Sequence, residues 1–181
     1  MDNISEVFSG RPENCDGRLA KEIAVYDFLD SLKIPYRRVD HDPADTIADC
    51  VEIEKVIGVG ICKNLFVRNR TGTEYYMIMM SGHKQFRTAE VSKKLGTSRL
   101  SFASRQEMEQ MLDVTPGSVS VMALKNDTAG RVKLCIDRDI INGEYIRCHP
   151  CINTSTLKIR TEDLLRCFLQ KVKHTPRIID I

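Results

Sequence analysis

The sequence has no long apolar run, no export signal and no large excess of charge of either sign. Its longest apolar stretch, around Tyr75 to Met80, is far shorter than the ~20 residues that span a bilayer, so it predicts a buried strand. The N-terminal segment 1–6 is polar and acidic, which does not fit a secretory signal. The net charge of +2 lacks the basic excess of dedicated nucleic-acid binders, although it is compatible with a local basic patch. We therefore expect a cytoplasmic protein that makes no use of a membrane.

The sequence also lacks a second close pair of Cys or His residues, and this decides how its cysteines are interpreted. Seven cysteines, an odd number without an export signal, predict reduced thiols that are mostly buried as small apolar groups. Cys148 and Cys151 form a C-x-x-C motif, but a zinc site would need two further ligands. A redox pair should open a helix, whereas a strand-like segment, 154–159, follows here. We predict no metal and no cofactor, and keep a thiol redox protein as the less favoured alternative.

Apolar periodicity and turn residues divide the chain into alternating helices and strands. Its 181 residues suffice for one core, so we expect a loosely held lead-in over 1–17 and one domain over 18–181. The patterns predict helices over 18–32, 88–95, 104–112 and 162–172, and a further helix that Asp45 or Thr46 caps and that runs to Val56. They predict strands over 36–39, 63–68, 74–80, 99–102, 118–124, 132–136, 145–147 and 154–159. Several hairpins connect these strands, which favours an α/β fold with a mixed sheet ringed by helices over a purely parallel, doubly wound one.

Lys63 is the single residue that is most suggestive of a functional role. It begins an apolar strand directly after a glycine-flanked approach, and a lysine there can hold a phosphate or a developing negative charge. From the residues alone, a lysine that extends into solvent at a strand end is the favoured interpretation. Neighbouring Cys62 has no His or Asp close in sequence to activate it as a nucleophile, so a packed thiol is favoured there.

Further polar residues in turns each have a functional and an ordinary interpretation. Gly117 follows Pro116 in a turn whose backbone N–H groups could point at a carbonyl oxygen or a water, but from the residues alone an ordinary turn into a strand is the favoured interpretation. His41 could be a general base, but a histidine in a turn is more often solvated or capping. Basic residues that could bind phosphates, or form a solvated face, are Arg68 and Arg70 at a hairpin and a C-terminal set of Lys158, Arg160, Arg166, Lys171, Lys173 and Arg177.

These signals occur in a definite order between about Leu19 and Val172. The segments are Asp40-His41-Asp42-Pro43 with Thr46; Cys62-Lys63-Asn64-Leu65-Phe66-Val67-Arg68-Asn69-Arg70 followed by Tyr75-Tyr76; Arg99 to Ser104; Pro116-Gly117-Ser118-Val119-Ser120; Ala123 to Asp127; Asp137; and His149-Pro150 with Asn153 to Thr156. In this order they resemble the YbaK and prolyl-tRNA-synthetase editing-domain family in its freestanding form. The Lys-Asn-Leu-Phe strand, the Gly-x-Val-Ser loop and the late His-Pro are specific in combination.

The resemblance implies a mixed sheet, partly closed as a barrel, and hydrolysis of the ester between an amino acid and the terminal adenosine of tRNA. It implies that Lys63 holds that adenosine through its phosphate and that the Gly117 loop positions the ester and the water. It places Asp137 and His149 in the pocket lining, and it implies that a ribose hydroxyl of the tRNA helps to activate water. The residues expected to contact substrate or tRNA are His41, Thr46, Asn64, Arg68, Arg70, Ser118, Val121 and Asn153.

The chain departs from the family pattern at Val121, where the loop Gly-x-x-x-Pro usually has its proline. Proline would fix the local backbone, so this change bears on the shape of the loop and on the choice of substrate. The pattern, including Lys63 next to Asn64, is nearest to the alanyl-tRNA(Pro) deacylases, with the cysteinyl-tRNA(Pro) deacylases next. We expect a trans-acting enzyme whose partner is mischarged tRNA(Pro), with prolyl-tRNA synthetase as a further partner. A tRNA-binding module without catalysis is the alternative from another class.

Overall fold

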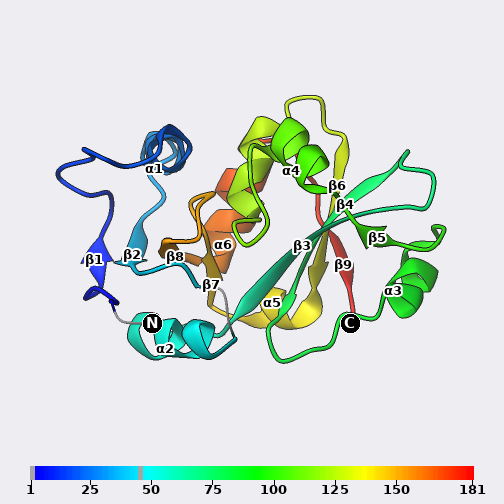
Figure 1. Ribbon diagram of the computed structural model, residues 1–181, viewed down its shortest axis with the longest axis horizontal. Helices are drawn as coiled ribbons and strands as arrows, with labels where there is room; N and C mark the ends of the chain where they lie inside the picture. The colour runs from blue at the N-terminus through cyan, green and yellow to red at the C-terminus, as the bar shows by residue number, and fades with distance from the viewer. Residues whose placement is uncertain (1–2, 45–46) are drawn as a thin grey trace.

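The computed structural model describes residues 3–44 and 47–181, and in that part of the chain the strands form two sheets (Figure 1). The smaller sheet is antiparallel and has the order β1 (Phe8–Ser9), β2 (Tyr36–Asp40), β8 (Ser155–Arg160), β7 (Tyr145–Cys148). The larger sheet has the order β5 (Ser101–Phe102), β3 (Cys62–Arg68), β4 (Tyr75–Ser81), β6 (Val132–Asp137), β9 (Arg177–Ile179). The two sheets approach each other where β3 passes β7.

The larger sheet is mixed, as the sequence predicts. β3 pairs antiparallel with both β4 and β5, whereas β6 pairs parallel with β4 and with β9. Both faces of β4 are buried: Met77 and Met79 lie in one apolar cluster, and Tyr76 and Ile78 lie in another. This explains why β4 has a continuous apolar sequence, because a strand that is covered on both faces needs no polar alternation. The mixed α/β fold expected from the sequence is confirmed.

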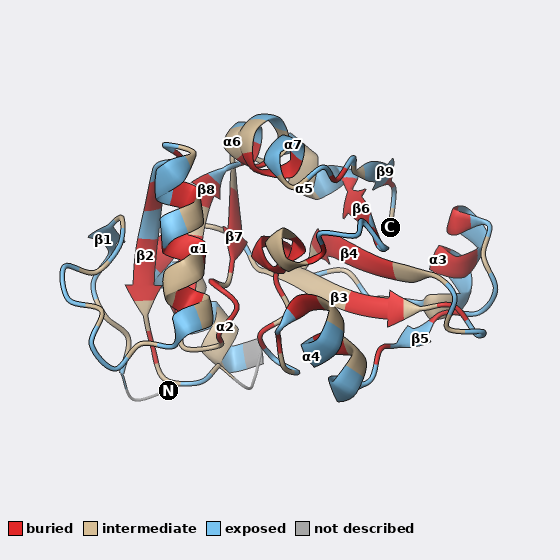
Figure 2. Cartoon of the chain, turned by 90° about the horizontal axis from the view of Figure 1, so that it is seen from above, coloured by how far each residue is buried: buried red, intermediate tan, exposed pale blue. Residues whose placement is uncertain are grey.

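Helices cover the sheets and turn their buried sides toward them (Figure 2). The helical elements are α1 (Ala20–Ser31), α2 (Ile47–Ile57), α3 (Thr88–Leu95), α4 (Arg105–Leu112), α5 (Arg138–Asn142), and a C-terminal run of α6 (Thr161–Asp163), the π-helical η2 (Leu164–Phe168) and α7 (Leu169–Lys171). α4 begins with a capping box, in which Glu107 N donates to Ser104 Oγ and Ser104 N donates to the Glu107 carboxylate. No helix in the described residues has the length and apolar character needed to cross a bilayer.

The strand predicted over 118–124 is wrong, because Val121–Asn126 forms the 3₁₀ helix η1. Met122 N donates to Ser120 Oγ at 3.2 Å, so Ser120 caps a helical turn. Val121, Met122, Ala123 and Leu124 are all buried. A short, continuous apolar run gives no periodicity that separates a buried strand from a buried helical turn.

The remaining differences lie near the chain ends and the helix starts. β1, α5 and β9 were not predicted, and β1 adds an edge strand from the N-terminal lead-in to the smaller sheet. The helix expected over 162–172 begins at Thr161, whose Oγ1 donates to the Gly143 carbonyl, and Arg160 occupies the N-cap position. The cap predicted at Asp45 or Thr46 lies outside the described residues.

Candidate functional site

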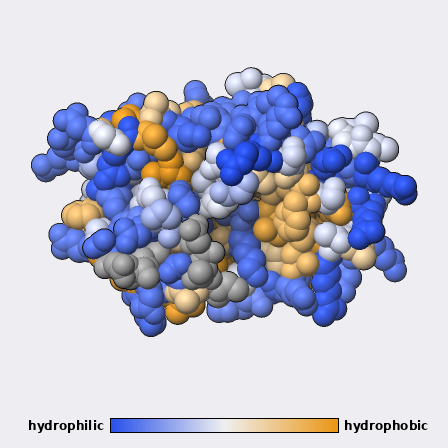
Figure 3. All heavy atoms as spheres, in the orientation of Figure 1, coloured by the Kyte–Doolittle hydropathy of each residue, from blue (hydrophilic) through white to orange (hydrophobic). Residues whose placement is uncertain are grey.

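A cavity of about 470 Å³ opens where β3 passes β7. Three stretches of the chain supply most of its lining: Ile61 to Phe66 along β3, the loop residues Pro116, Gly117 and Val119, and Arg147 to His149 at the end of β7. The other lining residues are Ala44, Cys50, Phe102 and Met108. In Figure 3 hydrophobic atoms gather in a hollow over the region where Figure 1 shows β3 and β5, with hydrophilic atoms around it. The cavity therefore combines an apolar wall with a small number of polar groups, which is typical of a ligand site.

Lys63 is the second residue of β3, and its side chain is hydrogen-bonded to the backbone of a second lysine, Lys84. Its Nζ donates to the carbonyl oxygen of Lys84 at 2.9 Å. The Nζ of Lys84 in turn lies 2.8 Å from the carboxylate of Asp137 and 2.7 Å from that of Asp139. The hydrogen bonds to these carboxylates raise the pKa of Lys84. Lys63 thus brings a positive charge to the cavity, and the hydrogen bond to the Lys84 carbonyl fixes the position of its ammonium group.

Asp137 is fully buried at the end of β6 and is not among the described residues that line the cavity. Besides its ion pair with Lys84, its carboxylate accepts a hydrogen bond from the backbone N–H of Ile181 at 3.3 Å. The link to Lys63 therefore runs through Lys84. The sequence could not show this arrangement, because Lys84 is 53 positions away from Asp137.

Asn64 presents an unsatisfied polar atom beside the cavity. Its Nδ2 donates weakly to the carbonyl of Cys62 at 3.5 Å, while its buried Oδ1 has no hydrogen-bond partner among the described residues. A buried acceptor without a partner destabilises the fold by about 1–3 kcal/mol. A ligand that carries an N–H or O–H group could remove this penalty by donating to Asn64.

Gly117 occupies the turn that the sequence predicts. The Ser118 N–H donates to the Thr115 carbonyl at 3.0 Å, Pro116 stands at the second position of the turn, and Gly117 has φ +88° at the third. These are the features of a type II turn, in which the third position favours glycine. A Cβ on Gly117 would lie 3.8 Å from Nδ2 of Asn153, so the side chain of Asn153 stands beside the turn.

The structure places the other predicted loop residues away from the cavity. Ser118 is buried, and its Oγ accepts from the Thr115 N–H and donates to the Thr115 carbonyl, so it holds the turn together. Val121 is fully buried in the core at the start of η1. At this position an apolar core residue takes the place of the family's proline.

His149 lines the cavity as a neutral imidazole of defined tautomer. Its Nδ1 lies 2.9 Å from the carbonyl oxygen of Ser155, which can only accept, so Nδ1 carries the proton and Nε2 has a free lone pair. Burial lowers the pKa of His149 to about 4, and nearby His41 and Arg147 act in the same direction. At neutral pH the ring can therefore accept a hydrogen bond at Nε2 but carries no charge.

His41 lies near His149, and both of its ring nitrogens form hydrogen bonds within the protein. The two ring centroids are 6.4 Å apart. The Nδ1 of His41 donates to the Asp42 carbonyl at 2.7 Å, and its Nε2 accepts from Thr156 Oγ1 at 2.9 Å. Burial lowers the pKa of His41 as well. His41 is not among the described residues that line the cavity, so it supports the residues of the cavity wall and does not face the site itself.

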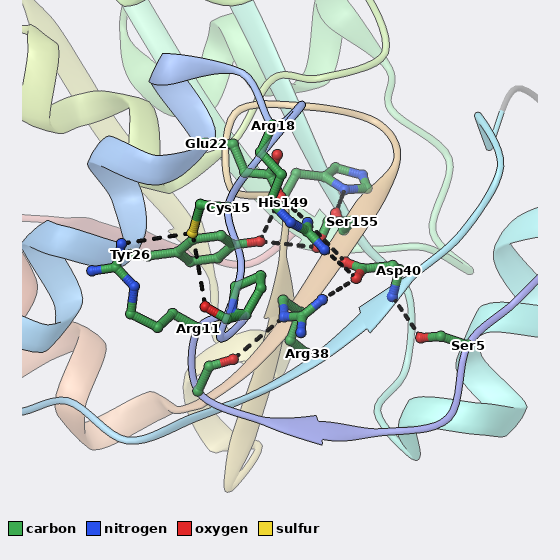
Figure 4. A network of polar contacts seen from close by, with 12 residues as sticks. Ser5, Arg11, Cys15, Arg18, Glu22, Tyr26, Arg38, Asp40, His149 and Ser155 are labelled. Carbon is green, nitrogen blue, oxygen red and sulfur yellow. Dashed lines mark hydrogen bonds and ion pairs between the residues drawn. The ribbon is translucent and has the colours of Figure 1, made fainter.

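A chain of polar contacts connects the base of His149 to helix α1 (Figure 4). The Ser155 and Tyr26 hydroxyls are 3.4 Å apart, and the Tyr26 hydroxyl donates to Glu22 at 2.7 Å. Glu22 also pairs with Arg18, whose other nitrogen lies 2.6 Å from Asp40. Buried networks with satisfied partners specify one arrangement of side chains. This network fixes the strand that carries the Ser155 carbonyl, and therefore the orientation of His149.

Arg147 is the site residue that the sequence analysis missed. It lies on β7, it is 4% exposed, and its guanidinium donates to the Cys50 carbonyl at 2.9 Å. Burial lowers its pKa, and no carboxylate of the described residues forms an ion pair with it. A buried guanidinium without an anion is suited to bind a negative group. The available signal was an arginine between Ile146 and Cys148 in an otherwise apolar strand.

The thiols near the cavity are not activated. Burial raises the pKa of Cys62 to about 12 and that of Cys151 to about 12, and it raises the pKa of Cys148 as well. All three are free and protonated at neutral pH, which argues against a thiolate nucleophile or metal ligand. The described residues contain no group of three or more His, Cys, Asp or Glu side chains arranged to hold a metal ion.

The remaining predicted binding residues lie outside the cavity. Arg68 is 3.3 Å from the carboxylate of Glu107, and Arg70 is exposed at the hairpin between β3 and β4. Thr46 lies outside the described residues. The structure thus gathers Lys63, Asn64, Gly117 and His149 around one cavity, with Asn153 beside the turn.

The neutral state of His149 predicts a pH dependence of stability. An exposed histidine has a pKa of about 6.5, so the unfolded chain binds a proton at pH 5 that the folded chain does not. The stability that comes from the neutral ring is complete above pH 6.5 and is lost as the pH falls toward 4. Between pH 7 and pH 5 we expect the free energy of unfolding to fall by about 2 kcal/mol through this residue.

Urea unfolding at both pH values checks this expectation. Asparagine at position 149 does not titrate in this range, so the stability of His149→Asn should fall less than that of the wild type. Equal losses in the two proteins would contradict the tautomer and the burial assigned to His149.

Comparisons with known proteins show which family this chain resembles over most of its length. A family model described as an aminoacyl-tRNA editing domain matches residues 41–167. The chain is 32% identical over 141 residues to the prolyl-tRNA editing protein ProX of Acetoanaerobium sticklandii, covering 78% of this chain and 86% of that protein. It is 30% identical over 164 residues to the prolyl-tRNA synthetase associated domain-containing protein 1 of Danio rerio, covering 89% and 86%.

A solved structure has the same fold at low sequence identity. The crystal structure of the hypothetical protein APE2540 superposes with a TM-score of 0.65 at 16% identity, covering 87% of this chain and 97% of that one. The family model spans β3, the Gly117 turn and His149, which are the segments that meet at the cavity. The chain therefore belongs to the aminoacyl-tRNA editing domain family.

Proposed function

We propose that this protein hydrolyses the ester that joins a wrongly attached amino acid to the terminal adenosine of tRNA(Pro). The observation that carries the proposal is the cavity in which the Lys63 ammonium, the glycine turn at Gly117 and the neutral His149 meet. These groups can bind a phosphate, admit an ester close to the main chain and orient a water, and they come from three distant parts of the sequence. The ProX relative is named as a prolyl-tRNA editing protein, which supports the same assignment.

In this proposal the chemistry needs no nucleophile from the protein. A water oxygen attacks the ester carbonyl carbon, the bond from that carbon to the ribose oxygen breaks, and the ribose oxygen takes up a proton. The products are a free amino acid and an uncharged tRNA. The raised pKa of Cys62 fits this scheme, because a protonated thiol does not compete with water for the ester.

His149 orients the water rather than removing its proton completely. A base with a pKa of about 4 is weak at neutral pH, although its Nε2 still accepts a hydrogen bond from water. A ribose hydroxyl of the tRNA therefore shares the task of activating the water. Arg147 supplies positive charge where the carbonyl oxygen becomes negative, and Asp137 supports the site through Lys84.

The amino acid that fits best is alanine. Apolar side chains, among them Val119 and Met108, line the cavity together with the Gly117 turn. Steric exclusion alone can reject proline, which is larger than alanine, and each additional methylene changes selectivity by about 1–3 kcal/mol. Serine and cysteine are close to alanine in size, so their esters are the substrates that compete with it.

The direct test follows both products of the reaction. Incubation of the protein with tRNA(Pro) that carries radiolabelled alanine should release free alanine and leave an intact tRNA that can be charged again. If the protein binds the charged tRNA but alanine is released no faster than in buffer, the protein is a tRNA-binding module and not an enzyme. A chelator should not change the rate, because the proposed reaction uses no metal.

A further inference from the structure

A second hollow, of about 640 Å³, lies next to the cavity. It is lined by Arg70, Thr88, Arg99, Leu100, Ser101 and Phe102. Phe102 lines the cavity as well, so the two hollows share this residue. None of the residues that line the hollow is acidic.

Phe102 is unusually exposed for an aromatic residue. It lies on β5, at the edge of the larger sheet, and 57% of its surface is accessible (Figure 1). Its ring meets that of Phe86 at a centroid distance of 6.0 Å and an angle of 56°, which holds one side of the ring and leaves the rest open. An exposed aromatic face of this kind binds a nucleobase by stacking.

The pairing of β5 with β3 places the side chains of Phe102 and Lys63 on the same face of the larger sheet. Phe102 lies opposite Val67 in the antiparallel pairing of β3 and β5, so the two side chains share one face of the sheet. Since alternate residues of a strand point the same way, Lys63, Leu65 and Val67 lie on that face too. Lys63 and Val67 are four positions apart, which is roughly 13 Å along the strand.

The two arginines of the hollow are free to bind phosphate. Arg70 and Arg99 are exposed, and neither forms an ion pair with a described residue. Arg68, which is nearby in sequence, differs because it pairs with Glu107. An aromatic platform beside unpaired cations is the combination that holds single-stranded nucleic acid.

We propose that the hollow formed by Arg70, Arg99 and Phe102 binds the unpaired nucleotides that precede the terminal adenosine of the tRNA. A base stacks on Phe102, and the two arginines contact the adjoining phosphates. This assignment rests on the proposed function, because it continues the strand whose last nucleotide occupies the cavity. It explains why the edge of the sheet exposes a large aromatic side chain.

The test compares alanyl-tRNA(Pro) with 3′-O-alanyl-adenosine 5′-phosphate, an ester that keeps the phosphate assigned to Lys63 and lacks every preceding nucleotide. Phe102→Ala should raise the KM for alanyl-tRNA(Pro) by roughly five-fold to a hundred-fold, the range expected for the loss of one stacked base. The double variant Arg70→Ala with Arg99→Ala changes no residue that lines the cavity, so it should raise the same KM and hydrolyse the short ester within two-fold of the wild type. Phe102→Tyr keeps the stacking face and should restore the KM. Phe8→Ala removes an exposed phenylalanine from the other sheet and should change neither reaction.

A binding measurement separates this proposal from the proposed function. A fluorescently labelled single-stranded RNA that ends in CCA and carries no amino acid should bind the wild type at least five-fold more tightly than Phe102→Ala or the double variant Arg70→Ala with Arg99→Ala. If no ester is hydrolysed but this difference is found, the platform stands and the catalytic assignment fails. Equal RNA binding by wild type and variants overturns the platform. An equal loss of activity on alanyl-tRNA(Pro) and on the short ester in the double arginine variant overturns it as well.

Discussion

Replacing Lys63 with alanine should lower kcat/KM for the hydrolysis of alanyl-tRNA(Pro) by about two decades or more. Lys63 brings a cation to the end of β3, and the Lys84 carbonyl holds its ammonium at the cavity. A charged contact to a phosphate contributes about 3 kcal/mol, which corresponds to a hundred-fold change in rate. The fold should survive, because Lys63 is only partly buried and forms no ion pair with a described residue.

Two further variants make this result specific. Lys93→Ala removes one positive charge from an exposed position on α3 and should keep nearly full activity, which controls for the general attraction of tRNA to the protein. Lys63→Arg keeps the charge but changes its shape and reach, so it should recover only part of the rate. A folded Lys63→Ala protein with wild-type turnover would remove Lys63 from the site.

Gly117→Ala should reduce hydrolysis by about ten-fold to a hundred-fold. Gly117 has φ +88°, which an L-residue adopts only with strain, so the turn must shift when a Cβ is added. A displacement of about 1 Å at a catalytic turn can cost a hundred-fold in rate. The added methyl group itself meets only Asn153 Nδ2, at 3.8 Å, so the effect comes from the backbone rather than from a clash.

Gly130→Ala is the matched control for this prediction. Gly130 also has a positive φ, of +62°, it has no neighbour within 4 Å of the added Cβ, and it is not among the cavity residues. Both variants should lose about 1–2 kcal/mol of stability in urea unfolding. Only Gly117→Ala should lose activity, and a similar loss of activity in both variants would mean that strain in general, not the position of this turn, limits the rate.

The sequence was sufficient to predict the architecture where local pattern and burial agree. The apolar strands at β3 and β4 and the helix expected over 104–112 all appear in the structure. The pattern failed at 118–124, where a buried 3₁₀ turn has the same apolar composition as a strand. It also failed for the edge strands β1 and β9, which have only two and three residues and hardly any periodicity.

The sequence predicted which segments form the candidate site, because the family pattern marks them, but it did not predict the contacts between them. Lys63, Gly117 and His149 meet at the cavity although they are far apart in sequence. The contact of Asp137 with Lys84 and the exposure of Arg147 to the cavity depend on tertiary packing. The tautomer of His149 depends on the Ser155 carbonyl, a backbone group that no residue type reveals.

The measurement that tests the central claim most directly is the ratio of kcat/KM for alanyl-tRNA(Pro) to that for prolyl-tRNA(Pro), with seryl- and cysteinyl-tRNA(Pro) assayed at the same enzyme concentration. An editing enzyme must leave the correct product intact, and the extra ring carbons of proline should reduce its rate by about a hundred-fold or more relative to alanine. We expect alanine to be released fastest and proline hardly faster than in buffer. A clear preference for the cysteine ester would change the substrate but keep the editing function, whereas prolyl-tRNA(Pro) hydrolysed as fast as alanyl-tRNA(Pro) would contradict it.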